Sequence, residues 1–205
     1  MQLRYSVNSP FARKARLVAH EVGVAHAVSL LATKLRTDDP DFWADNAVAK
    51  IPVLVTEDGE RIADSNVICE YLNVEHGQGR LLAPSGPQRW QHLSLISLAD
   101  AVVEAAMLAR SETSRPAQQQ QGLRISQEMA KVTRGLDAIA RALQDCVPGQ
   151  PVFSLRDIAV ASALGWLELR FGRALLFDSR TDLARWWAMA ESRPSMQATR
   201  PAPDA

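Results

Sequence analysis

The feature that most constrains the fold is a strand, a loop and a helix in quick succession at the N-terminus. Residues 2–7 alternate apolar and polar side chains, as in a strand with one buried face. Ser9 suits a helix N-cap, and Pro10 suits the first helical position because its missing N–H would have no partner there. Apolar residues at helical spacing follow from Phe11, and Gly23 favours a stop. Such a helix start presents N–H groups and a positive dipole end to an anion, for example a thiolate.

The chain up to about Leu82 mixes strand and helix patterns. Three further strands and two helices are expected there, the strands at 26–31, 51–55 and 61–63 and the helices at 41–46 and from Ser65. The strand at 26–31 should run parallel to the first strand because a helix intervenes. Asp58-Gly59 lies between the other two strands and is a strong hairpin signal.

The composition changes at residues 83–87, which are rich in Pro, Ser and Gly, and strand patterns fade beyond them. Helices are expected at 88–110, 118–143, 155–171 and 181–192. We therefore predict an α/β domain over residues 1–79 and an all-helical domain over residues 87–205. The last residues, from Arg200, are expected to fray or to lie over the surface.

Charge and cysteine content exclude several classes of protein. Lys+Arg and Asp+Glu are equal at 23 each, so there is no basic field for nucleic acid or an anionic membrane. We find no signal-peptide pattern and no apolar run near ~18 residues. Cys69 and Cys146 form neither a CxxC pair nor a ligand set, and the four histidines lack metal-ligand spacing. A cytoplasmic protein without a metal site is expected.

Four short motifs occur in a fixed order along the chain. They are Ser9-Pro10-Phe11-Ala12-Arg13-Lys14, Lys50-Ile51-Pro52-Val53-Leu54, Ala63-Asp64-Ser65 with Glu70-Tyr71-Leu72, and Ser154-Leu155-Arg156-Asp157. In this order and spacing they resemble the glutathione transferase family, particularly its bacterial members with serine in the first loop. The resemblance covers nearly the whole chain. It implies a thioredoxin-like N-terminal domain that binds glutathione, an all-α C-terminal domain lining an electrophile pocket, and a homodimer.

Ser9 is the catalytic residue that this resemblance implies. Its O–H would donate to the sulfur of bound glutathione. A free thiol has a pKa near ~8.5 and is only a few per cent ionised at neutral pH, so a hydroxyl donor at a helix N-terminus would favour the thiolate. The alternative is an N-cap without chemistry. Because residues 9–12 contain no cysteine, disulfide exchange through a protein thiol is disfavoured.

The resemblance also implies residues that hold glutathione near the third strand. The Ile51–Pro52 bond is expected to be cis, and the backbone of Val53 would then pair with the cysteinyl unit. A proline that opens a strand is also ordinary structural punctuation. Lys50 would reach the glycyl carboxylate, or would be a solvated surface lysine.

Asp64 and Ser65 would hold the γ-glutamyl end. The Ser65 O–H and the first helical N–H groups would bind the carboxylate, and Asp64 would bind the ammonium group. Both residues also suit a helix cap. Family members often carry glutamate at the position of Asp64, which leaves the reach of the shorter side chain open. Asp100, with Glu104 as a weaker rival, would reach across the dimer to the glutathione amine.

Other conspicuous residues are interpreted as structural. Ser154 and Asp157 form a capping-box pattern that starts a buried helix, and Trp166, Trp186 and Trp187 are expected in the core or at a domain interface. The apolar stripe along helix 88–110 fits the core, the electrophile pocket or the dimer seam, and the sequence does not divide it.

The predicted function is that of a glutathione transferase, which activates the glutathione thiol for attack on a small hydrophobic electrophile. One alternative is a non-catalytic binding or regulatory module of the same fold. Another is a glutathione-dependent reductase or peroxidase. The partners expected are glutathione, the electrophile and a second copy of the chain.

Overall fold

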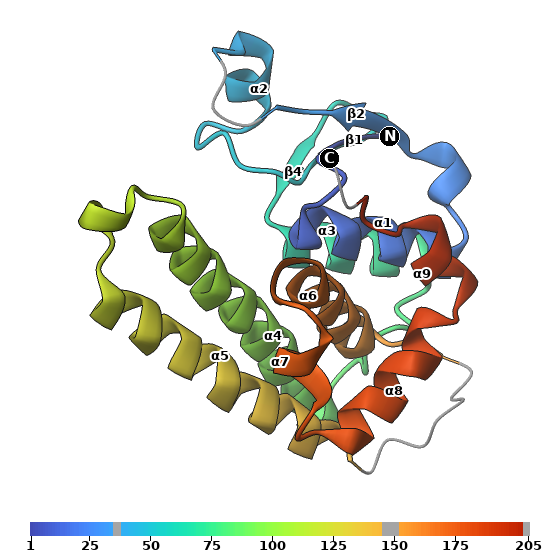
Figure 1. Cartoon of the computed structure of the whole chain (residues 1–205). Coiled ribbons are helices and arrows are strands. Elements are labelled where there is room, and N and C mark those ends of the chain that lie inside the picture. The colour runs from blue at the N-terminus through green and yellow to red at the C-terminus, as the bar shows by residue number, and fades with distance from the viewer. Residues whose placement is uncertain (35–37, 145–151, 203–205) are drawn as a thin grey trace.

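The computed structural model describes residues 1–34, 38–144 and 152–202. Cys146 and the last three residues of the predicted frayed end lie outside this part of the chain. Within it, four strands form one sheet in the order β2-β1-β3-β4 (Figure 1). Their bounds are β1 Gln2–Tyr5, β2 Ser29–Ala32, β3 Val53–Val55 and β4 Arg61–Ala63. β1 is parallel to β2 and antiparallel to β3, and β3 and β4 form the predicted antiparallel hairpin.

Three predicted strands are too long. The strand predicted at 51–55 begins only at Val53, directly after Pro52, which has no N–H to donate to a neighbouring strand. The strand predicted at 26–31 is wrong at its start, because residues Ala25–Ala27 form a 3₁₀ turn and β2 begins at Ser29. Ser29 N donates to Met1 O at 3.0 Å, so pairing starts where β1 begins to offer a partner. The first strand ends at Tyr5 and not at residue 7, since the chain turns there and Ser9 N donates to Ser6 O at 3.1 Å.

Three helices accompany the sheet. They are α1 Pro10–Val22, α2 Pro40–Asp45 and α3 Ser65–Tyr71, which continues into a π-helical turn, η2 Leu72–His76. All three start near the predicted positions. Gly23 ends α1 in the left-handed conformation, with φ 90°, where a residue with a Cβ would be strained.

Beyond residue 85 the described chain forms helices and their connections. The bounds are α4 Gly86–Thr113, α5 Gly122–Leu143, α6 Leu155–Phe171, α7 Arg173–Phe177, α8 Thr181–Glu191 and α9 Pro194–Ala198. α5 starts later than predicted because residues Ala117–Gln119 form a separate 3₁₀ turn. α7 and α9 have five residues each and are too short to show helical periodicity. The predicted fold class is confirmed, and the domain limits 1–79 and 87–205 stay predictions.

α6 lies at the centre of the helical part and packs against α1, α4 and α8 (Figure 1). Residues 158–167 of this helix are all buried, which explains its almost continuous apolar sequence. Its N-terminus has the predicted capping box, in which Asp157 Oδ2 accepts from Ser154 N at 3.0 Å. The three tryptophans predicted in the core, Trp166, Trp186 and Trp187, are buried.

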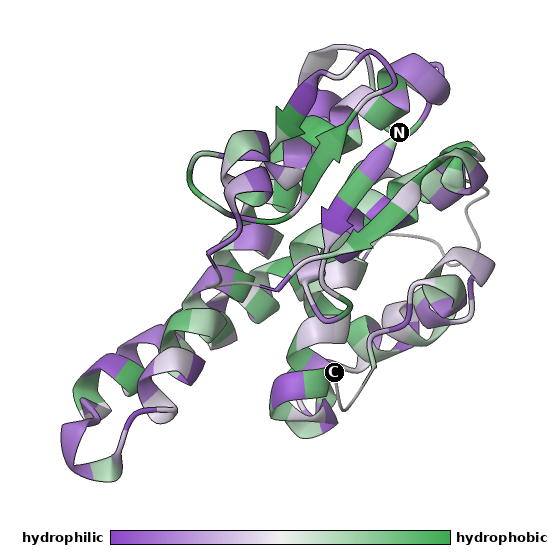
Figure 2. Ribbon diagram, turned by 90° about the horizontal axis from the view of Figure 1, so that it is seen from above, coloured by the Kyte–Doolittle hydropathy of each residue, from purple (hydrophilic) through white to green (hydrophobic). Residues whose placement is uncertain are grey.

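The helix pair α4–α5 projects away from the sheet, and its tip is largely hydrophilic (Figure 2). α4 has the length and the mean hydropathy, 1.5, of a membrane-spanning helix, but half of that stretch is buried in the protein. It packs against α5 and α6. Of its apolar stripe, Ile96, Val103, Ala105 and Ala106 belong to the core, whereas Leu108 is exposed.

Candidate active site at one end of the sheet

The sheet topology brings most of the predicted site residues to one edge. Arg4 near the end of β1 pairs with Val53 at the start of β3, and Val53 pairs with Ala63 at the end of β4. The end of β1, the start of β3 and the end of β4 therefore lie side by side. Ser9 follows β1 and Ser65 follows β4, so α1 and α3 both begin at this edge.

Ser9 is the N-cap of α1, as predicted. Its Oγ accepts a hydrogen bond from Ala12 N at 3.2 Å, and Pro10 occupies the first turn. The hydroxyl is half-buried. Because the cap uses an oxygen lone pair, the O–H proton remains able to donate to another group. The cap and the predicted role toward a thiolate are therefore compatible.

The predicted backbone site at β3 has the expected bond geometry. The Ile51–Pro52 peptide is cis, and Val53 follows it with a fully buried side chain. Any ligand contact of Val53 must therefore come from its main chain. Lys50 is exposed and precedes this bond, and its carbonyl accepts from Asn46 Nδ2 at 2.8 Å. That contact fixes the Lys50 backbone and leaves its ammonium group toward solvent.

Asp64 and Ser65 stand at the start of α3. Asp64 caps the helix by accepting from Asn66 N at 2.7 Å, and its backbone has φ 72° and ψ 131°. This region is strained for a residue with a Cβ, and such strain is common at functional sites. Ser65, the first residue of α3, is 4% exposed, so its side chain lies almost entirely below the protein surface.

Asp100 lies beside this helix start but is engaged within the same chain. Both of its carboxylate oxygens accept from Lys14 Nζ at 2.8 Å, and Oδ2 also accepts from Asn66 Nδ2 at 2.8 Å. Its predicted contact across a dimer stays a prediction. Glu104, the weaker rival, is exposed.

The sequence interpretation missed two buried cations on α1. Arg13 and Lys14 are 4% and 2% exposed. Arg13 donates to Met196 O at 3.1 Å and to Thr199 Oγ1 at 3.4 Å, and burial lowers the pKa of its guanidinium to about 10. The spacing of these two residues is the signal that was missed. Arg13 and Lys14 each precede a core residue, Leu17 or Val18, by four positions and therefore lie on the same buried face of α1.

Neither Cys69 nor a group of metal-ligating side chains forms a second reactive site in the described part of the chain. Cys69 is buried at 3% exposure, and burial raises the pKa of its thiol to about 12. A thiol that remains protonated at neutral pH is a poor nucleophile. Among residues 1–34, 38–144 and 152–202, no three His, Cys, Asp or Glu side chains are grouped to hold a metal ion.

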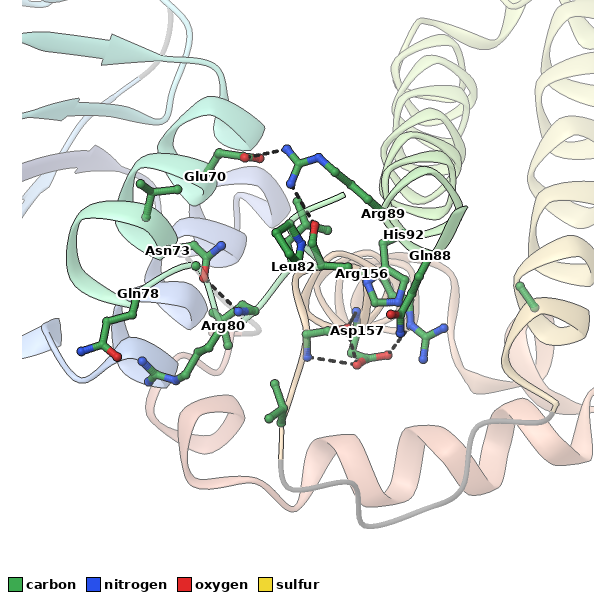
Figure 3. A pocket seen from close by; sticks show the side chains of 18 residues that line it. Glu70, Asn73, Gln78, Arg80, Leu82, Gln88, Arg89, His92, Arg156 and Asp157 are labelled. Carbon is green, nitrogen blue, oxygen red and sulfur yellow. Dashed lines mark hydrogen bonds and ion pairs between the residues drawn. The ribbon is translucent and has the colours of Figure 1, made fainter. Parts of the chain in front are cut away.

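A wide cavity of about 1070 Å³ lies elsewhere, between η2, residues 78–84 and the starts of α4 and α6 (Figure 3). Its carboxylates are paired within the chain. Glu70 contacts Arg89 at 2.8 Å and Asp157 contacts Arg156 at 3.2 Å. Among the described residues that line it, none is a predicted glutathione contact. The edge of the sheet is therefore the better candidate for the active site.

Comparisons with known proteins found a matching family model and several relatives. Residues 8–75 match the family model described as the N-terminal domain of glutathione S-transferase. This match spans Ser9, Lys50, Val53, Asp64 and Ser65. The chain is also 31% identical over 176 residues to the uncharacterized GST-like protein YibF of Escherichia coli K12, and the alignment covers 83% of each protein.

Two solved structures resemble nearly the whole chain. A glutathione transferase family member from Pseudomonas fluorescens Pf-5, with bound glutathione, has a TM-score of 0.91 and 31% identity, with 98% of both chains covered. A glutathione S-transferase from Methylobacillus flagellatus KT, also with glutathione bound, has a TM-score of 0.86 and 35% identity. There the match covers 98% of this chain and 99% of the other.

Proposed function

We propose that this chain, which belongs to the glutathione S-transferase family, binds glutathione at the sheet edge and transfers its thiol to a small hydrophobic electrophile. The observation that carries the proposal is the convergence of Ser9, Val53 and Ser65 at one edge, built by the pairing of β1, β3 and β4. The glutathione bound to the two similar proteins supports it.

Ser9 activates the thiol in this proposal. Its O–H donates to the sulfur while its oxygen continues to cap α1, so the hydrogen bond and the helix dipole act together. Both favour the thiolate over the thiol. The thiolate attacks an electrophilic atom and a carbon–sulfur bond forms. A leaving group departs with the bonding electrons, or a proton is taken up at the neighbouring atom in an addition.

The remaining predicted residues hold the tripeptide. The Val53 main chain aligns the cysteinyl unit, because its own side chain is buried. Ser65 O–H and the N–H groups at the start of α3 bind the γ-glutamyl carboxylate, and the exposed Asp64 carboxylate binds the ammonium group. Lys50 reaches toward the glycyl carboxylate. Catalysis then comes mainly from positioning and from stabilisation of the thiolate.

A homodimer in the cytoplasm is part of the proposal. Val67 on α3, Val74 on η2 and Trp90 on α4 are 53%, 51% and 64% exposed. Each of these residues lies within four positions of Glu70 or Arg89, whose ion pair joins α3 to α4. Exposed apolar side chains on neighbouring helices favour an interaction surface. We propose that a second copy of the chain covers it.

The test is the Ser9→Ala variant, with Ser154→Ala as the matched control. Each substitution removes an N-cap that contributes about 1 kcal/mol, but Ser154 caps α6, which is not one of the two helices that begin at the proposed site. The thiol pKa of bound glutathione is measured by titrating the thiolate absorbance. We expect Ser9→Ala to raise this pKa toward the value of about 8.5 for a free thiol, and to lower kcat/KM by about 10².

An unchanged thiol titration in Ser9→Ala would remove Ser9 from this role. Glutathione binding without turnover of any electrophile would indicate a binding module. Reduction of hydroperoxides or mixed disulfides without conjugation would indicate the reductase class. Ser154→Ala should lose stability without any change in the thiol pKa.

A further inference from the structure

A lysine buried at the junction of three helices has no place in the mechanism so far. The side chain of Lys14, on α1, is 3% exposed. Its Nζ donates to Asn66 Oδ1 at 2.7 Å and to both carboxylate oxygens of Asp100 at 2.8 Å. The ring of Phe11 lies beneath it, with its centroid 5.8 Å from Nζ.

The three side chains form a closed ring of hydrogen bonds. Asn66 accepts from Lys14 through Oδ1 and donates to Asp100 through Nδ2 at 2.8 Å, while Asp100 accepts from both partners. We call these residues, Lys14, Asn66 and Asp100, the Lys14 bridge. Each contact involves a charged group, and such hydrogen bonds are shorter and stronger than neutral ones.

Stability alone is a weak reason for this arrangement. Removing an ammonium group and a carboxylate from water costs several kcal/mol per ion, and well-packed apolar side chains often replace a buried pair without loss. The bridge does fix geometry, because it specifies where three helices stand relative to one another. Its members come from α1, α3 and α4, which are brought together only by the tertiary fold.

The bridge joins the two parts of the proposed site. Lys14 is five residues after Ser9 on α1, and Asn66 directly follows Ser65 on α3. Asn66 is held twice, through its side chain by the bridge and through its backbone N–H by Asp64 at 2.7 Å. Movement of Asn66 would therefore displace both residues that are proposed to hold the γ-glutamyl group.

We propose that Lys14 is a positioning residue, which acts through Asn66 to hold the γ-glutamyl binding groups at a fixed distance from Ser9. The inference rests on the proposed function, since it concerns the same glutathione site. Lys14 does not touch the thiol in this scheme. Lys14 contributes only to binding of the γ-glutamyl end of glutathione. A protein without the Lys14 ammonium group should therefore recognise the γ-glutamyl part of the tripeptide poorly.

The Lys14→Met substitution removes the ammonium charge and its hydrogen bonds but keeps a side chain of nearly the same length. The Lys14→Arg substitution keeps the positive charge. A cavity of about 140 Å³, lined by Lys14, Asn66 and Cys69 among others, gives room for the larger guanidinium. Lys131→Met is the matched control, because Lys131 also pairs with a carboxylate, that of Glu128 at 2.7 Å, but on the surface of α5.

The measurement is the dissociation constant for glutathione and for cysteinylglycine, the dipeptide that lacks the γ-glutamyl group. We expect Lys14→Met to weaken glutathione binding by about tenfold or more, the scale of a misplaced binding group. Binding of cysteinylglycine should stay within about twofold, since it does not use the γ-glutamyl groups. Lys14→Arg should restore most of the loss, and Lys131→Met should change neither constant.

The outcomes separate this inference from the proposed function. If the unmodified protein does not prefer glutathione to cysteinylglycine, the proposed γ-glutamyl site itself is wrong. If the preference exists and Lys14→Met retains it, Lys14 has no positioning role. An equal loss for both ligands would show general damage and also reject the inference. Should Lys14→Met fail to fold, Asn66→Ala leaves the Lys14–Asp100 pair intact and must produce the same selective loss.

Discussion

Replacing one glycine in the central helix tests how tightly the core is built around a buried charge. Gly165 lies in α6, and a Cβ added to it would stand 2.2 Å from Arg13 Nη1 and 3.3 Å from the Trp187 ring. In an exposed helix, Gly→Ala stabilises by about 1 kcal/mol. In α6 this stabilisation is opposed by the cost of displacing the Arg13 guanidinium. Whether Gly165→Ala raises or lowers the free energy of unfolding therefore depends on whether the guanidinium can move without losing its hydrogen bonds.

The hydrogen bonds of Arg13 decide the magnitude. The guanidinium donates to Met196 O and Thr199 Oγ1, and each bond from a charged donor contributes about 1.5 kcal/mol or more. Losing both costs about 3 kcal/mol, against a helical gain of about 1 kcal/mol. We therefore expect Gly165→Ala to lower the free energy of unfolding by about 2 kcal/mol. For a chain of this size that corresponds to a fall in Tm of about 4–8 °C.

The assay is chemical and thermal unfolding of single and double variants. In an Arg13→Met background the obstructing group is absent, so Gly165→Ala should be neutral or stabilising there, with a coupling of about 3 kcal/mol between the two sites. Gly122→Ala, at a position where a Cβ meets open space, is the control and should not destabilise. A Gly165→Ala variant as stable as the unmodified protein would refute this reasoning.

Two further predictions concern the N-terminal sheet and the proposed dimer. Burial alone would raise the pKa of Asp45, but its hydrogen bonds with Arg4 and Arg61 lower it below the ordinary value. Because the folded-state pKa is depressed, the stabilisation is present above the unfolded value of about 3.9 and is lost as pH falls through the folded value. Asp45→Asn should therefore cost about 2 kcal/mol at pH 7 and progressively less below pH 4 in denaturant titrations, and a pH-independent difference would contradict this. Trp90→Glu should convert a dimer to a monomer in sedimentation equilibrium, whereas Leu123→Glu, at a site 73% exposed on α5, should not; equal behaviour of both variants would exclude the proposed interface.

Local signals predicted the elements that depend on neighbouring residues. The Ser9 cap, the stop at Gly23, the hairpin around Asp58-Gly59 and the capping box at Ser154 all lie where the sequence placed them. Each depends on hydrogen bonds or backbone conformations within a few residues. The strand limits predicted at residues 6–7, 26–28 and 51–52 were wrong because a strand continues only while it and its partner both offer hydrogen-bonding groups.

The predicted site residues were found by their motifs, but their relations were not. Ser9, Val53 and Ser65 were each identified from a separate sequence motif. They come together in space because β3 pairs antiparallel with both of its neighbours, β1 and β4. For Asp100, the family resemblance implied a contact across a dimer, which stays a prediction. The fold adds two partners within the chain that no local pattern indicated, Lys14 and Asn66.

The amino-acid sequence by itself determined the order of the main helices and strands and the starts of the capped helices, because caps, turns and side-chain periodicity act over a few residues. It also supplied the family motifs and showed that the first loop contains no sulfur. Only the tertiary structure decided which charges are buried and with what they pair, such as Lys14 with Asp100 and Arg13 against Gly165. The physical reason is that desolvation and ion pairing depend on distances between helices far apart in the chain.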